Sequence, residues 1–145
     1  MTATASHLSL QIENEFDAIP AANDTVSQWL EERGATPAFV YLANLSIEEL
    51  ATNCIKYGYD DTAIHIICIE LEISPTGLVI TVIDDGHPFN PLELAEPDTS
   101  LPIGDRPIGG LGIHLLRKLS STMRYERVDG KNRVSLTKTN HPSKS

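Results

Sequence analysis

The stretch LVITVIDDGHPFNP, residues 78–91, joins an apolar run to carboxylates, a glycine and two prolines. Its first six residues, rich in β-branched side chains, indicate a buried strand. The strand ends at Asp84, Asp85 and Gly86, and the glycine allows a ligand to approach the backbone closely. A carboxylate in this position can accept a hydrogen bond from an exocyclic amine such as that of adenine. An ordinary Asp-Gly turn has the same sequence, so both interpretations stay open on this stretch alone.

A strand and two helices are predicted upstream of this stretch. Apolar residues alternate with polar ones over 8–12, which is typical of a half-buried strand. Apolar residues recur at helical spacing over 18–32 and 37–57, and Gly34 and Gly58 are the stop signals. The expected buried positions on the two helices are Ile19, Ala22, Val26, Trp29 and Leu30, then Phe39, Leu42, Ala43, Ile47, Leu50, Ala51, Cys54 and Ile55.

A hairpin, a long loop and a second hairpin complete the predicted order. The run 63–73 reads as a strand that pairs with 78–83. Five prolines then interrupt 88–107, and loops of this length are usually lids, binding loops or disordered segments. A short helix over 113–120 precedes strands near 122–128 and 133–138, which Asp129-Gly130 joins. Because hairpins dominate, we expect an α+β fold: a two-layer α/β sandwich with a mixed, mostly antiparallel sheet and helices on one face.

Length and composition favour one ordinary globular domain, residues 1–145 with a core of about 8–138. Hydrophobic residues make up 41% and charged residues 21%, which disfavours general disorder. No apolar run approaches the ~20 residues that span a bilayer, and no secretory signal is recognisable, so no membrane association is expected. Cys54 and Cys68 have no metal-site spacing and are interpreted as reduced thiols on apolar faces, as in a cytoplasmic protein.

Charge is divided unevenly along the chain. Residues 1–105 carry a net charge of −16 and residues 106–145 a net charge of +7, which together give −9. The acidic total disfavours direct nucleic-acid binding, because that binding depends on neutralising phosphates. The basic C-terminal third suits a small polyanion or an acidic partner, although a solvated basic face has the same composition.

Two further motifs accompany the Asp84 stretch. On the second helix Glu49, Asn53 and Lys56 follow one another at i, i+4 and i+7, which places a carboxylate, an amide and an ammonium along one face. The amide oxygen suits Mg²⁺, and the carboxylate can act as a general base. The sequence GGLG at 109–112 opens a helix, where glycine N–H groups can meet phosphate oxygens. A solvated helix face and a flexible hinge are the simpler interpretations of these two motifs.

Taken together, the three motifs and their order resemble the nucleotide-binding fold of the GHKL, or histidine-kinase-like, ATPase superfamily, also called the Bergerat fold. The resemblance is strongest to the bacterial anti-sigma regulatory factors, which are serine/threonine protein kinases, and it covers about residues 8–138. The final hairpin, YERVDGKNRVSLTK at 125–138, also resembles that family. Tyr57 stands where many relatives have histidine, and Pro88 replaces a frequent glycine.

The resemblance implies ATP and Mg²⁺ as ligands and assigns a role to each site residue. It makes Glu49 the catalytic general base and Asn53 the ligand of Mg²⁺ held by the ATP phosphates. It makes Asp84 the residue that binds the adenine amine, beside Gly86. It also implies an ATP lid over about 87–108. The remaining implied nucleotide-binding residues are Lys56, Gly109, Gly110, Leu111, Gly112 and Thr137.

The resemblance further implies a function and partners. The chain would hold a sigma factor as an anti-sigma factor, and would phosphorylate a STAS-type anti-sigma factor antagonist on serine. A homodimer is implied as well. One alternative is a nucleotide-gated switch that binds a partner without transferring phosphate. Another is a detached catalytic domain of a sensor kinase, which is disfavoured because no helical dimerisation segment with an acceptor histidine is recognisable.

Overall fold

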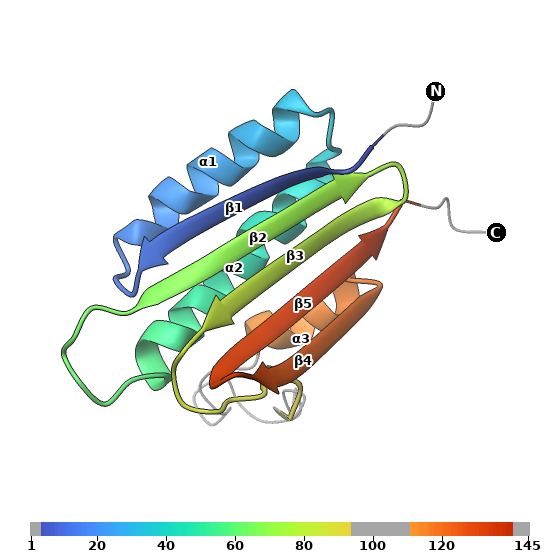
Figure 1. Cartoon of the computed structure of the whole chain (residues 1–145). Helices are drawn as coiled ribbons and strands as arrows, with labels where there is room; N and C mark the ends of the chain where they lie inside the picture. Colours follow the sequence, from blue (N-terminus) through green and yellow to red (C-terminus); the bar gives the residue numbers. More distant parts are fainter. Residues whose placement is uncertain (1–3, 94–110, 141–145) are drawn as a thin grey trace, which may run out of the picture.

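The computed structural model describes residues 4–93 and 111–140, which form a sheet with helices packed on one of its faces (Figure 1). The order of elements is the one that the sequence predicts. The elements are β1 (Ser6–Glu13), α1 (Ala18–Glu32), α2 (Pro37–Tyr57), β2 (Ile66–Ser74), β3 (Gly77–Asp84), the short 3₁₀ turn η1 (Pro91–Glu93), α3 (Leu111–Leu119), β4 (Thr122–Val128) and β5 (Lys131–Thr139).

The sheet has the strand order β1-β2-β3-β5-β4. All four pairings are antiparallel, so within the described residues the sheet is more regular than the mixed sheet expected. The α+β class and the two-layer sandwich are confirmed. In the β3–β5 register Asp84 lies opposite Asn132, so the end of β3 lies beside the start of β5.

The core lies between the sheet and the helices and contains the residues that helical periodicity predicts. All five predicted positions of α1 are buried, and so are six of the eight predicted on α2. The exceptions are Cys54 and Ile55, which are half-buried near the end of α2. Ser46 is buried as well, and its hydroxyl donates a 2.7 Å hydrogen bond to the Leu42 carbonyl, which satisfies the polar group without a tertiary partner.

Two element boundaries differ from the prediction. The second strand begins at Ile66 rather than at residue 63. Asp61 accepts a hydrogen bond from the Ala63 N–H, and Asn14 accepts one from the His65 N–H, so side chains hold this segment as a loop. The short helix begins at Leu111 and so includes the last glycine of GGLG, which puts Gly112 in its first turn. Asp129 and Gly130 have positive φ angles of 53° and 76°, as a two-residue hairpin turn requires.

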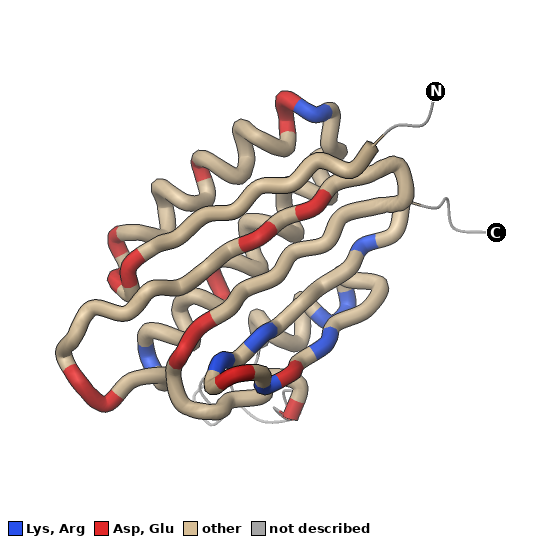
Figure 2. The backbone as a smooth tube through the Cα atoms, viewed as in Figure 1, with Lys and Arg blue, Asp and Glu red and all other residues tan. Residues whose placement is uncertain are grey.

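The charge division of the sequence is also a division in space. Apart from Arg33, which follows α1, and Lys56 on α2, the described Lys and Arg side chains lie on α3, β4 and β5, whereas Asp and Glu dominate the rest (Figure 2). Cys68 does not lie on the apolar face expected for it. Its neighbours Ile67 and Ile69 are buried under the helices, so alternation along β2 turns Cys68 to the opposite face of the sheet. No helix among the described residues is long and apolar enough to cross a membrane.

Candidate nucleotide-binding site

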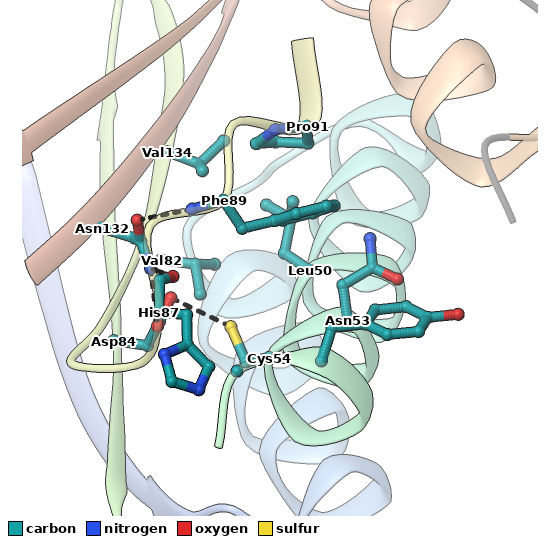
Figure 3. A pocket seen from close by; sticks show the side chains of 12 residues that line it. Leu50, Asn53, Cys54, Val82, Asp84, His87, Phe89, Pro91, Asn132 and Val134 are labelled. Atoms are coloured by element: carbon teal, nitrogen blue, oxygen red, sulfur yellow. Dashed lines mark hydrogen bonds between the residues drawn. The ribbon is translucent and has the colours of Figure 1, made fainter. Parts of the chain in front are cut away.

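A cavity opens between α2 and the adjacent ends of β3 and β5 (Figure 3). The empty space between its lining residues is about 400 Å³ and includes open solvent. The walls are largely apolar and carry a few polar groups. Asp84, which is 6% exposed, is the one carboxylate among the lining residues. The lining residues are Leu50, Asn53, Cys54, Tyr57, Gly58, Val82, Asp84, His87, Phe89, Pro91, Asn132 and Val134.

Asp84 is held by donors from three different parts of the chain. Its Oδ1 accepts from the Gly86 N–H at 2.9 Å and from Asn132 Nδ2 at 3.0 Å. Its Oδ2 accepts from the Cys54 thiol at 3.1 Å. Each carboxylate oxygen can accept two hydrogen bonds, so Oδ2 retains capacity for a donor entering the cavity. The carboxylate is therefore fixed in place and still able to bind a ligand amine.

Gly86 occupies a position where no side chain fits. A Cβ there would lie 2.7 Å from the Gly58 carbonyl oxygen and 2.9 Å from its Cα. The next residue, His87, donates its N–H to the same Gly58 carbonyl at 2.8 Å, and Arg127 donates to the Gly86 carbonyl at 2.7 Å. The close contact of two backbones is what joins the end of α2 to the loop after β3, and it explains the glycine of the Asp84 stretch.

Asn132 is a site residue that the sequence interpretation missed. It is 3% exposed and uses its whole side-chain amide. Nδ2 donates to Asp84 and to the His87 carbonyl, and Oδ1 accepts from the Phe89 N–H and from the Tyr125 hydroxyl. The signal was present: alternation along β5 places residue 132 on the same inward face as Val134 and Leu136, where an amide is unusual.

Substitution of Asn132 by alanine is expected to lower the free energy of unfolding by about 2–4 kcal/mol. The physical reason is that four polar groups, three of them on buried or half-buried residues, would each lose a hydrogen-bond partner. Chemical denaturation followed by circular dichroism measures this. The control is Ser135→Ala on the outer face of the same strand, which removes a single hydrogen bond, with the Thr81 hydroxyl, and should cost only about 1 kcal/mol. Equal losses for the two variants would contradict the role given to Asn132.

Of the three polar residues predicted along one face of α2, only one lines the cavity. Asn53 lines the cavity, whereas Lys56 is exposed and does not. Glu49 lies one turn before Asn53, half-buried against the start of α3, and a Cβ at Gly112 would overlap its carboxylate. Burial raises the pKa of Glu49, the Glu48 charge raises it further, and Lys56 opposes both. A carboxylate with a raised pKa is a better proton acceptor, as general-base catalysis requires.

The aromatic residues near the cavity have separate positions. Phe89 lines it, and its ring centroid lies 6.3 Å from that of Tyr57, which is half-exposed at the mouth. Tyr59 packs outside the cavity, stacked on His65 at 4.0 Å, and donates to Asp85. Phe89 and Tyr57 therefore extend the apolar wall that Leu50 begins.

The structure brings five of the ten predicted site residues together and places Lys56 and Thr137 elsewhere. The five lie near the cavity, where the second half of α2 packs against the end of β3: Glu49, Asn53, Asp84, Gly86 and Gly112. Thr137 does not join them. It lies opposite Val79 on the outer face of the sheet, because β5 turns alternate residues inward and 137 is out of phase with 132 and 134. The predictions for Gly109, Gly110 and most of the lid fall outside the described residues, and for Leu111 only the backbone is described.

This donor set fits a purine nucleotide and its metal ion. A flat ring system suits walls formed by Leu50, Val82 and Val134, and Asp84 Oδ2 can accept from an exocyclic amine. Among residues 4–93 and 111–140, no group of three or more His, Cys, Asp or Glu side chains is placed to hold a metal ion. One amide oxygen, that of Asn53, suits Mg²⁺, which usually takes few protein ligands beside phosphates and water.

Comparisons with known proteins agree with this geometry. The model of the histidine kinase-like ATPase domain family matches residues 12–138. The serine/threonine-protein kinase BtrW of Bordetella bronchiseptica is 25% identical over 104 residues, which cover 70% of this chain and 72% of BtrW. The structure of the RsbU and RsbW domains of Rv1364c from Mycobacterium tuberculosis matches with a TM-score of 0.65 at 18% identity. That match covers 92% of this chain, which spans about a third (31%) of the mycobacterial one. The chain belongs to the histidine kinase-like ATPase domain family.

Proposed function

We propose that this protein is an ATP-dependent serine/threonine kinase and anti-sigma factor, which holds a sigma factor and phosphorylates a STAS-type antagonist on serine. The observation that carries the proposal is that Asp84 and Asn53 line one cavity, with Glu49 one turn of α2 before Asn53, in a domain of this ATPase family. The similarity to a protein named as a serine/threonine kinase supports it. In this proposal the chain acts as one domain, in the cytoplasm, as a homodimer.

Each residue has one task in the proposed reaction. Asp84 accepts a hydrogen bond from the adenine amine, and the apolar walls cover the base. Asn53 would hold Mg²⁺, which when bound neutralises charge on the phosphates. Glu49 takes the proton from the serine hydroxyl as its oxygen attacks the γ-phosphorus, and the bond from that phosphorus to the β–γ bridging oxygen breaks to leave ADP. Such a reaction depends on positioning and charge more than on covalent chemistry by the protein.

The rate of phosphoryl transfer is expected to fall as pH decreases through the raised pKa of Glu49, because only the ionised carboxylate accepts a proton. Two neighbours should move this acid limb in opposite directions. Glu48→Gln removes a negative charge, lowers the pKa and shifts the limb to lower pH. Lys56→Gln removes a positive charge and shifts the limb to higher pH. Single-turnover rates across pH measure the shifts, and an acid limb that neither substitution moves would contradict the role of Glu49.

The proposal is tested by incubating the purified protein with Mg²⁺, [γ-³²P]ATP and a purified STAS-type antagonist protein from the same organism. The expected result is label on one serine of the antagonist, and its loss when that serine is replaced by alanine. An antagonist that binds but acquires no label would reject the kinase activity. The second candidate, a nucleotide-gated switch, would then be favoured. The contact between Glu49 and Gly112 also supports that candidate, because it joins α2, which forms one wall of the cavity, to α3.

A further inference from the structure

The floor of the cavity contains a thiol that the proposed reaction does not use. Cys54 follows Asn53 on α2, lines the cavity, and donates its S–H to Asp84 Oδ2 at 3.1 Å (Figure 3). Among the described residues, Oδ2 accepts from Cys54 alone, whereas Oδ1 accepts from two donors. The thiol is therefore the donor to the carboxylate oxygen that retains capacity for a further hydrogen bond.

We propose that Cys54 is a positioning residue for base recognition: its S–H occupies one lone pair of Asp84 Oδ2 and directs the other toward the amine of a 6-aminopurine nucleotide. This inference rests on the proposed function, because it assumes that a purine nucleotide occupies the cavity. It goes further by assigning part of the selectivity for the amine to a residue on the opposite layer from Asp84.

Cys54 is anchored well enough to perform this task. Its carbonyl accepts from the Gly58 N–H at 2.9 Å, and the Gly58 carbonyl accepts from the His87 N–H at 2.8 Å. The last turn of α2 is thus attached to the loop that follows Asp84, so the distance between sulfur and carboxylate is set by backbone contacts. A cysteine thiol without a metal ion is mostly protonated near neutral pH, so the sulfur carries the proton that it donates to Asp84.

A thiol suits this position better than a hydroxyl. The helical hydroxyls of Thr25 and Ser46 donate to carbonyls four residues earlier, at Ala21 and Leu42. A serine at position 54 would have the same local acceptor in its own helix, at residue 50. The thiol is a weaker donor to neutral carbonyls, so its proton remains available for the stronger acceptor, the Asp84 carboxylate.

The test compares two ligands that differ only at the 6-position of the base: ADP and purine riboside 5′-diphosphate, which has hydrogen in place of the amine. Calorimetric affinities are measured for the full chain and for Cys54→Ala, which removes the donor, and Cys54→Val, which removes the donor but keeps the space filled. We expect both variants to bind ADP about three- to tenfold more weakly, and to bind the analogue within about twofold of the parent protein. Cys68→Ala, a thiol on the outer face of the sheet, should leave both affinities unchanged.

The two ligands separate positioning from packing. A purely structural effect would weaken both ligands equally, and such a result would overturn the proposal, as would Cys54 variants that keep the preference of the parent protein for ADP. Failure of the parent protein to bind either ligand would instead reject the proposed nucleotide-binding function. Thermal unfolding of each variant confirms that the compared proteins are folded.

Discussion

Replacing Asp84 by asparagine is expected to weaken ADP binding by about 100-fold or more, a loss of about 2.7 kcal/mol. The change is nearly isosteric, so the reason is electrostatic. If the new amide oxygen keeps the hydrogen bonds from Gly86 and Asn132, the new NH₂ group takes the place of Oδ2. It then faces both the Cys54 thiol and the ligand amine, and all three groups are donors. Calorimetric titration with ADP measures the effect.

Asp85→Asn is the matched control for this experiment. Asp85 is the next residue, its side chain is 49% exposed, and it accepts from the Tyr59 hydroxyl outside the cavity. Its substitution should change ADP affinity by less than about threefold, as expected for an exposed surface group. Equal losses at 84 and 85 would show that general charge, rather than one directed acceptor, controls binding.

Replacing Glu49 by glutamine is expected to lower the rate of phosphoryl transfer about 10²- to 10⁴-fold, while ADP affinity stays within about threefold. Glutamine keeps the shape that packs against Gly112 but cannot accept the hydroxyl proton. The division between rate and affinity follows from the structure, because Glu49 does not line the cavity that the base would occupy. Single-turnover transfer measured beside ADP titration gives both quantities.

Glu48→Gln controls for the loss of a negative charge on the same turn of α2, since Glu48 is exposed. It should retain transfer near neutral pH. A Glu49→Gln protein that still transfers phosphate at the parent rate would remove Glu49 from the catalytic role. A variant that loses transfer but still releases and binds its partner in response to nucleotide would favour the switch.

The spacing of apolar residues predicted the helices and strands well, because it depends only on the geometry of each element and on which of its sides is buried. Helical spacing identified every buried position of α1, and alternation identified β1. The Asp129-Gly130 turn and the stop at Gly34 could be predicted from their glycines, because the backbone there has a positive φ that few other residues tolerate. The predicted start of the second strand was wrong because backbone hydrogen bonds to the side chains of Asp61 and Asn14, which are not visible as a pattern, hold 63–65 as a loop.

The site was harder to predict, because it is built from pairs of residues distant in sequence. Asp84 was identified from its own stretch, but its partners Cys54 and Asn132 lie 30 and 48 positions away. Only the register of β3 against β5, and the packing of α2 on the sheet, make these contacts. The prediction for Thr137 was wrong for a related reason. A motif gives the position of a residue along a strand, but the alternation of side chains decides which face of the sheet that residue occupies.

A crystal structure of the protein with ADP and Mg²⁺ would show directly whether the cavity between α2, β3 and β5 holds the nucleotide. The purine is expected between Leu50 and Val134, with its amine within hydrogen-bonding distance of Asp84 Oδ2, and the metal ion is expected on Asn53 Oδ1. A complex in which Phe89 and Tyr57 fill that cavity, and the nucleotide binds elsewhere, would contradict this expectation.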